Sequence, residues 1–242
     1  MAQVLFIFAH QDDEIAAASR IRYAIARGDT VTCVFLTDGA SRVPSHVRDA
    51  ESRRALSRLG VDDVRFIGSL ERIADGTLPE HLDRALTLVD ASVLAADEVI
   101  TLAYEGGHQD HDAAHLVAAV FARRRGIPCR EMPLYNAANV PRPLFRVHHP
   151  IGDGWESRRI THREKLANAL LCRQYQSQRS TWLALMPLML FSRARELTRL
   201  ADLQRATQPP HQGALLYERR FHYPYARFAA FAEAFLHRSL VS

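Results

Sequence analysis

Two short stretches of the sequence bring histidines and acids together. AHQDDE spans residues 9–14 and GGHQDH spans residues 106–111. Between them they contain His10, Asp12, Asp13, His108, Asp110 and His111. Imidazole and carboxylate groups are ligands of zinc-type metal sites, and a catalytic site of this kind uses three protein ligands and keeps one position open. The two stretches therefore predict metal-assisted hydrolysis, provided that the fold brings them together.

The acids of the first stretch have a structural alternative. Acids in the first turn of a helix stabilise its dipole and accept bonds from its free N–H groups, so Asp12, Asp13 and Glu14 need no function to explain them. The second stretch favours the metal site, because three of the chain's twelve histidines fall within residues 108–115. His115 is expected to pack on its helix, since a three-ligand set is complete without it.

The elements that must position these residues alternate between strands and helices. Apolar runs at 4–9, 30–39, 64–67, 98–103 and 130–135 are typical of buried strands. Helical patterns separate them at 12–27, 46–59, 79–95 and 111–125. This order predicts an α/β fold with a Rossmann-like, doubly wound, mostly parallel sheet. Both stretches follow strands, and ligand sites in such sheets lie beyond the carboxyl ends of the strands.

The pattern changes from about residue 140. Residues 139–155 read as loops with a short strand, 158–177 and 192–205 as helices, 214–222 as a strand and 226–238 as a last helix. We expect one domain over residues 1–242, in which a smaller C-terminal α+β subdomain (141–242) packs on an α/β core (1–140) that carries the metal site. With 48% hydrophobic and 24% charged residues the chain can bury a core of this size.

The stretches resemble the motifs of a known family. AHQDDE is similar to AHPDDE, and GGHQDH to GHPDH, of the LmbE/PIG-L zinc-dependent deacetylases, which act mainly on N-acetylglucosamine-type substrates. TDG (37–39), RDAESRRALSRLG (48–60) and QYQSQ (174–178, after Lys165) resemble further segments of the family. The resemblance covers residues 1 to about 125 in order, with weaker support to 178. It implies an LmbE-like fold and an activity like that of N-acetylglucosaminyl-phosphatidylinositol de-N-acetylase.

The resemblance also implies roles for single residues. His10, Asp13 and His111 would bind Zn²⁺ or another divalent transition metal. Asp12 would be the general base. His108 would stabilise the oxyanion or act as general acid, and Asp110 would orient a histidine.

Four further positions bear on the site, and the resemblance implies a role for the first of them. Arg48 would approach the acyl or sugar oxygens of the substrate; the alternative is an exposed helix arginine paired with a nearby acid. Gln11 and Gln109 stand where the family has proline, and because neither proline is a ligand, we expect the geometry to survive. Asp38, in the TDG turn, is placed for a role behind the metal ligands.

The implied reaction is removal of the N-acetyl group from an amino sugar or glycoside by a zinc-bound water. The alternative is a non-catalytic or degenerate sugar- or metal-binding member of the same fold, against which the retained Asp12 argues. A pI of about 9.2 raises nucleic-acid binding as a third hypothesis. The sequence has no GxGxxG, no GxxxxGK[ST] and no dense basic run, so we expect no nucleic-acid partner.

Location and contacts follow from a few remaining features. Cys33, Cys129 and Cys172 are far apart and lack CxxC spacing, and the N-terminus lacks the pattern of a signal peptide, so we expect a cytoplasmic protein. TWLALMPLMLF (181–191) is expected first to pack in the core. The alternatives are a homo-oligomer interface and a contact with a lipid-linked sugar or the inner face of the membrane. His148 and His149 are expected to belong to loop or strand structure; the alternative is a role at the mouth of the site.

Overall fold

A computed structural model describes residues 1–40, 43–191 and 195–241. Seven strands form one sheet in the order β3-β2-β1-β4-β5-β9-β8. They are β1 (Gln3–Phe8), β2 (Thr30–Phe35), β3 (Asp63–Arg65), β4 (Glu98–Leu102), β5 (Cys129–Met132), β8 (Glu156–Arg159) and β9 (Arg195–Leu200). The first five strands pair in parallel, whereas β9 runs antiparallel to β5 and β8 antiparallel to β9. The fold is therefore the mostly parallel α/β sheet predicted from the sequence.

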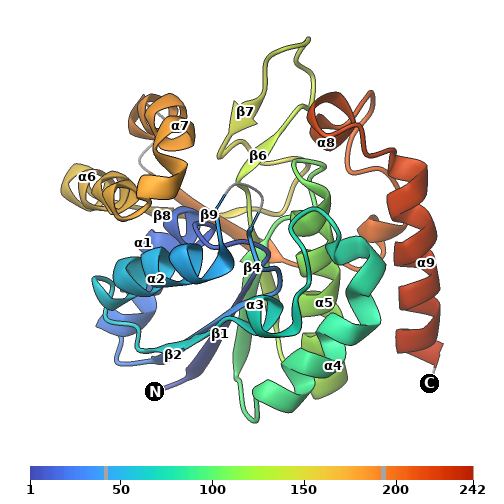
Figure 1. Ribbon diagram of the computed structural model, residues 1–242, viewed down its shortest axis with the longest axis horizontal. Helices are drawn as coiled ribbons and strands as arrows, with labels where there is room; N and C mark the ends of the chain where they lie inside the picture. The colour runs from blue at the N-terminus through green and yellow to red at the C-terminus, as the bar shows by residue number, and fades with distance from the viewer. Residues whose placement is uncertain (41–42, 192–194, 242) are drawn as a thin grey trace.

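Helices cover both faces of this sheet (Figure 1). One face carries α1 (Glu14–Ala26) and α2 (Ser45–Ser57). The other carries α4 (Leu82–Ser92), α5 (Gln109–Arg125) and α9 (Tyr225–Val241). Shorter elements lie near the carboxyl ends of the strands: α3 (Ile67–Glu71), α6 (His162–Leu171), α7 (Arg179–Phe191), α8 (Leu216–Arg220) and the hairpin of β6 (Tyr135–Asn136) and β7 (Arg146–Val147).

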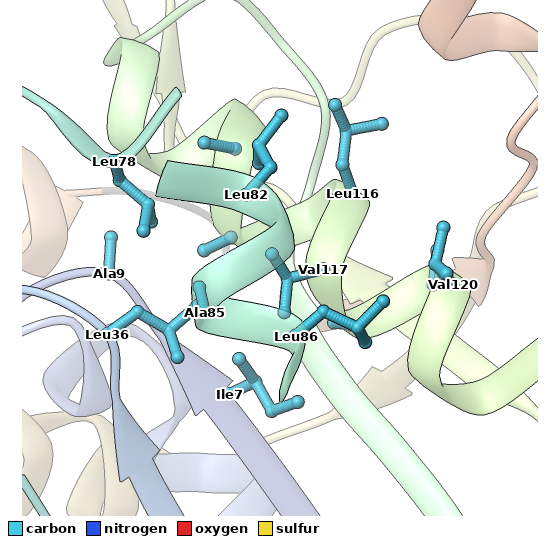
Figure 2. Close-up of a cluster of buried hydrophobic side chains, with 14 of the residues drawn as sticks. Ile7, Ala9, Leu36, Leu78, Leu82, Ala85, Leu86, Leu116, Val117 and Val120 are labelled. Atoms are coloured by element: carbon cyan, nitrogen blue, oxygen red, sulfur yellow. The ribbon is translucent and has the colours of Figure 1, made fainter. Parts of the chain in front are cut away.

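The central strand β1 is buried on both faces, which explains its continuous apolar sequence. Val4, Phe6 and Phe8 belong to the hydrophobic cluster under α1 and α2. Leu5 and Ile7 belong to the cluster under α4 and α5. Figure 2 shows this second cluster, in which side chains from the sheet meet those of the two helices: Ile7, Leu36, Leu82, Leu86 and Val117.

The order of the strands brings the two histidine-rich stretches together. From β1 the chain builds outward to β2 and β3, and then returns to place β4 on the other side of β1. β1 and β4 are neighbours in register, with Ile7 opposite Thr101. The residues that follow these two strands therefore meet at the point where the direction of winding reverses, which is where ligands bind in open α/β sheets.

Two predicted elements of the C-terminal third are wrong. The helix predicted at 192–205 is β9, because Glu196, Thr198 and Arg199 are buried by pairing with β5 and β8; residues 192–194 lie outside the described residues. This pairing overrides the helical propensity of a Leu-, Ala- and Arg-rich segment. The strand predicted at 214–222 contains α8, whose start is fixed by Glu218 accepting the N–H of Leu215 at 2.8 Å.

The segment predicted as one helix over 158–177 is also divided. It contains the end of β8, then α6, and then 3₁₀ turns at Cys172–Gln174 and Gln176–Gln178. Because β8 and β9 extend the same sheet as the N-terminal strands, the two parts of the chain share one sheet. The single domain over residues 1–242 stays a prediction, which this continuity supports.

The apolar segment 181–191 forms most of α7, and it is only partly covered. Leu183 is 59% exposed and Leu190 is 38% exposed. Core packing, the first explanation for this segment, therefore accounts for only part of it. In the part of the chain that the structure describes, we find no helix with the length and apolarity needed to cross a membrane.

Candidate metal centre

Three predicted ligands converge beyond the ends of β1 and β4. His10 and Asp13 lie in the turn after β1, and His111 lies in the first turn of α5. The Nδ1 atom of His10 is 3.2 Å from Nε2 of His111, and this Nε2 is 3.0 Å from Oδ1 of Asp13. All three side chains are less than a tenth exposed. They form one of two groups among the described residues that could hold a metal ion.

The donor atoms of this group fit a small divalent cation. Ligands at the usual Zn–N and Zn–O distances of about 2.0–2.1 Å lie about 3.3 Å apart at the corners of a tetrahedron. The separations of 3.2 and 3.0 Å are close to that value. The second oxygen of Asp13, Oδ2, accepts the N–H groups of Ala9 and His10 at 3.1 and 2.9 Å, which leaves Oδ1 facing His111. We take His10, Asp13 and His111 as the residues able to hold the metal.

The other ring nitrogen of His10 faces two carboxylates. Its Nε2 is 3.0 Å from Oδ2 of Asp110 and 3.1 Å from Oδ1 of Asp75. Burial alone would lower the pKa of His10, but the charges of Asp75, Asp110 and Asp13 raise it well above the ordinary value. A carboxylate on the far nitrogen of a ligand histidine fixes its orientation and makes it a better ligand.

Asp75 was missed by the sequence analysis. It lies in the loop between α3 and the 3₁₀ turn at Leu78–His81, far in sequence from both stretches. Asp38 places it, because Oδ1 of Asp38 accepts the N–H of Asp75 at 3.0 Å. Asp110 holds the same loop by accepting the N–H groups of Gly76 and Leu78 at 2.6 and 3.0 Å. The TDG turn thus acts behind the metal ligands, as its position suggested.

Asp12 lies beside the ligands in an unusual backbone conformation. Its φ of 108° is rare for a residue other than glycine. Asp12 lines the same cavity as His10, Asp13 and His111, and Oδ1 of its carboxylate is 3.4 Å from Nη2 of Arg48. Burial raises the pKa of Asp12 to about 6, against the opposing effect of Arg48. Asp12 is therefore placed to exchange a proton in the cavity near neutral pH.

Glu14 stabilises the backbone conformation of Asp12. It is fully buried, and one of its oxygens, Oε2, accepts the N–H of Asp12 at 2.9 Å. The other, Oε1, accepts the hydroxyls of Ser52, at 2.5 Å, and Tyr175. Burial raises the pKa of Glu14 to about 8, although the Ser52 hydrogen bond opposes this change. Helix α2 and the segment after α6 are thus connected to the turn that carries Asp12.

Arg48 does not line the cavity. Its guanidinium is buried and donates to the carbonyl oxygens of Gly39, at 3.2 Å, and Gln11. The structure therefore buries it behind the turn of residues 10–13, so the exposed-arginine alternative is wrong, while a contact with substrate stays a prediction. Gln11 is also fully buried, and its amide donates to Oδ1 of Asp49 at 2.6 Å. The amide is held in place, and a Cβ at Gly39 would lie 2.2 Å from its oxygen.

Gln109 anchors a second loop in a similar way. Its amide donates to the carbonyl of Gly76 at 3.2 Å, in the loop that carries Asp75. Both glutamines at the family's proline positions are therefore buried and bonded to neighbouring turns, so they hold the geometry that we expected to survive.

His108 is near the ligands but outside this cavity. Its ring packs edge-on against His10, with centroids 4.7 Å apart, and against Phe221 at 4.6 Å. Its Nδ1 accepts the N–H of Asp110 at 3.2 Å, so the proton of the neutral ring lies on Nε2. Burial and the neighbouring His10 lower the pKa of His108 to about 3. A neutral N–H donor fits this environment better than a general acid does.

The cavity over the ligands has a volume of about 110 Å³. Sequence reasoning missed much of its wall, which comes from the β6–β7 hairpin and from α7: Leu134, Tyr135, Val147, His148, Thr181, Trp182 and Leu185. Tyr135 packs its ring 5.4 Å from that of His111. A Cβ at Gly107 would lie 2.2 Å from the Tyr135 carbonyl, so the second glycine of GGHQDH is required for this approach. Gly107 was therefore the one feature of the histidine-rich stretches that pointed to another segment packed closely against them.

His115 and the cysteines lie away from the cavity. His115 is 1% exposed, and its Nδ1 contacts the carbonyl of Leu102 at 3.1 Å and Glu131 at 3.2 Å, so it packs as expected. Cys33, Cys129 and Cys172 are buried and free.

Comparisons of the sequence match it to one family and to one curated protein. The model of the GlcNAc-PI de-N-acetylase (PIG-L) family matches residues 5–122. A 1D-myo-inositol 2-acetamido-2-deoxy-alpha-D-glucopyranoside deacetylase from Mycolicibacterium vanbaalenii is 29% identical over a match that covers 52% of this chain and 57% of that protein. The chain thus spans little more than half the length of this curated relative.

Solved structures share the fold over most of the chain. The zinc-inhibited form of teicoplanin deacetylase Orf2 has a TM-score of 0.60 and 16% identity, covering 83% of this chain and 99% of that one. An N,N'-diacetylchitobiose deacetylase from Pyrococcus horikoshii has a TM-score of 0.57 and 18% identity, covering 86% of this chain and 84% of that one. At these identities the likeness shows a common fold.

Proposed function

Since residues 5–122 form a PIG-L-family domain, we propose that the protein is a metal-dependent hydrolase that removes the N-acetyl group from an N-acetylglucosamine-type amino sugar or glycoside. His10, Asp13 and His111 hold the metal, which is Zn²⁺ or a similar divalent cation. The deacetylase names of the sequence relative and of the structural neighbours support this reaction class. The substrate is a small molecule or glycoconjugate.

The catalytic roles follow from the atoms that face the cavity. When bound, the cation polarises the amide carbonyl and lowers the pKa of a water molecule. Asp12 takes the proton from the attacking water and returns it to the leaving amine, since its carboxylate lines the cavity and its pKa of about 6 lies close to neutral. Glu14 and Arg48 are positioning residues that hold the turn of Asp12.

The developing oxyanion needs a donor that keeps its proton. The Tyr135 side chain lines the cavity, and burial together with the charges of Asp13 and Asp12 raises its pKa well above the usual range. It therefore stays protonated and donates to the oxyanion. His108 keeps a secondary role: its neutral ring packs edge-on against His10 and carries its proton on Nε2.

The observation that carries the proposal is the convergence of the Asp12 carboxylate with the donor atoms of His10, Asp13 and His111 on one cavity. A purely structural metal would not need this extra carboxylate. The test is a screen of N-acetylated sugars for free amine, run with metal-loaded and chelated protein. Amine release by the loaded protein alone is expected. Sugar binding without amine release would favour the non-catalytic alternative.

Two further assignments remain predictions. A cytoplasmic location agrees with three free, buried cysteines. A contact between α7 and a lipid-linked substrate or a second subunit rests on the exposure of Leu183 and Leu190.

A further inference from the structure

A second cavity adjoins the metal centre. It has a volume of about 60 Å³ and lies beyond the carboxyl end of β5, at the edge of the sheet where the metal ligands lie. Ala16 and His148 line both cavities, so the two share a wall. Nδ1 of His148 is 3.2 Å from the carbonyl of Pro133, which fixes its ring between them. The two cavities are therefore adjacent, with His148 in the wall between them.

The charges that line the second cavity are mostly positive. Lys165, the single lysine in the sequence, and Arg195 both line it. Of the described residues in its wall, Glu196 alone carries a carboxylate, and that group is 2.6 Å from Arg158 and 3.7 Å from Arg20. Among the described residues of this wall, two permanently cationic side chains therefore stand against one carboxylate, which is itself paired with arginines outside the wall.

The wall beneath these cations is held by buried polar contacts. The Asn168 amide donates to the Ser19 hydroxyl at 2.7 Å, which connects α6 to α1. Arg22 donates to the Asn168 carbonyl oxygen at 3.1 Å, and Arg158 donates to the Ser19 carbonyl at 2.9 Å. These contacts fix the position of α6 and therefore the backbone of Lys165. A fixed backbone lowers the conformational entropy that the cavity wall would lose when a ligand binds.

We propose that the second cavity binds an anionic group, a phosphate or a carboxylate, on the sugar or aglycone of the substrate, with Lys165 and Arg195 as its cationic ligands. An ammonium and a guanidinium on one cavity wall are the groups that bind such anions through charge-assisted hydrogen bonds. Burial lowers the pKa of His148, the hydrogen bond with the Pro133 carbonyl opposes this, and the Lys165 charge lowers it a little further, which agrees with a cation close to the shared wall. The inference deepens the proposed deacetylase function and rests on it for the substrate.

The first test compares three N-acetylated sugars: N-acetylglucosamine 1-phosphate, N-acetylmuramic acid and the neutral methyl N-acetylglucosaminide. We expect kcat/KM to be at least about tenfold higher for one of the anionic sugars, and the preferred one identifies the anion. Lys165→Met and Arg195→Met should each lower the ratio of anionic to neutral kcat/KM about tenfold, mainly through KM. Arg163→Met, on the same helix but outside this cavity, is the matched control and should keep the wild-type ratio. An unchanged ratio in both pocket variants would overturn the inference.

The second test separates the anion site from the reaction. Calorimetry measures binding of the same three sugars to metal-loaded protein in the Asp12→Asn background, with and without Lys165→Met. Tighter binding of an anionic sugar, weakened by Lys165→Met, supports the site even when no sugar is deacetylated by the wild type. Equal affinity for all three sugars overturns it, even when the deacetylase activity is real.

Discussion

The backbone N–H of Asp12 donates to a carboxylate oxygen of Glu14, two residues further along, at 2.9 Å. This bond holds Asp12 at a φ of 108°, a conformation that costs of order 1–3 kcal/mol for a residue other than glycine. Glu14 is in turn bonded by the hydroxyls of Ser52 and Tyr175. Glu14, the third acid of AHQDDE, therefore stabilises the backbone conformation of Asp12, the first.

Replacing Glu14 should affect turnover more than binding. We expect Glu14→Ala to lower kcat at least about tenfold with a small change in KM and with full metal content, because the Asp12 carboxylate loses its fixed position. Glu14→Gln should recover most of kcat, since its amide can bond Asp12, Ser52 and Tyr175 together. Equal losses in both variants, or a change confined to KM, would argue against positioning. Glu71→Ala, an exposed acid on α3, is the control.

The Asp75 carboxylate should strengthen metal binding through His10. Removing such an outer carboxylate commonly weakens a metal site about 10- to 100-fold, and we expect that loss for Asp75→Asn. Titration with Zn²⁺ against a competing chelator measures it. His111→Ala should lose the site altogether, whereas His237→Ala, at an exposed position on α9, should bind as the wild type does. Wild-type affinity in Asp75→Asn would remove Asp75 from the metal centre.

The Tyr135 hydroxyl should act in the transition state. Tyr135→Phe keeps the ring that packs against His111 and removes only the proton donor. We expect kcat and kcat/KM to fall together by about 10- to 100-fold while the metal content stays the same. Steady-state kinetics on any substrate found in the amine screen measures this. Unchanged kcat would assign the oxyanion to another donor.

Stability should depend on pH through Glu105. This side chain is 4% exposed, and burial, together with the charge of Glu131, raises its pKa from 4.5 to about 7, against the hydrogen bonds of Leu134, Asn136 and Tyr135. The pKa of Glu105 is higher in the folded protein than in the unfolded chain, so the protonated side chain stabilises the fold. This stabilisation is fully present below pH 4.5 and is lost as the pH rises through 7. Between pH 4.5 and 8 the free energy of unfolding of the wild type should fall relative to Glu105→Gln, by up to about 3 kcal/mol. Urea denaturation of both proteins at pH 4.5 and pH 8 measures this difference. An equal change in the free energy of unfolding of the two proteins would contradict the role of Glu105.

The convergence of His10, Asp13 and His111 could be predicted because it depends on local sequence and on simple topology. His10 and Asp13 follow one apolar strand, His111 follows another, and parallel sheets bring such ends together. Asp75 could not be predicted in this way, since it reaches His10 through a loop that Asp38 and Asp110 hold. Its position depends on tertiary contacts that no short pattern records.

The C-terminal third shows the same limit more strongly. β9 reads as a helix because its composition favours one, and only pairing with β5 and β8 makes it a strand. Tyr135 and His148 reach the cavity on a hairpin of two-residue strands, which is too short to give a periodic signal. Arg48 lay within a recognised segment, yet its side chain turns to the carbonyls of Gln11 and Gly39.

The most direct measurement is amine release by Asp12→Asn on the substrate that the wild type turns over, with the metal content of both proteins determined in parallel. Because Asn keeps the shape of the side chain and cannot take a proton, we predict an equal metal content and a fall in kcat of at least about 100-fold. Turnover at the wild-type rate by the metal-loaded variant would contradict the assignment of Asp12 as the base.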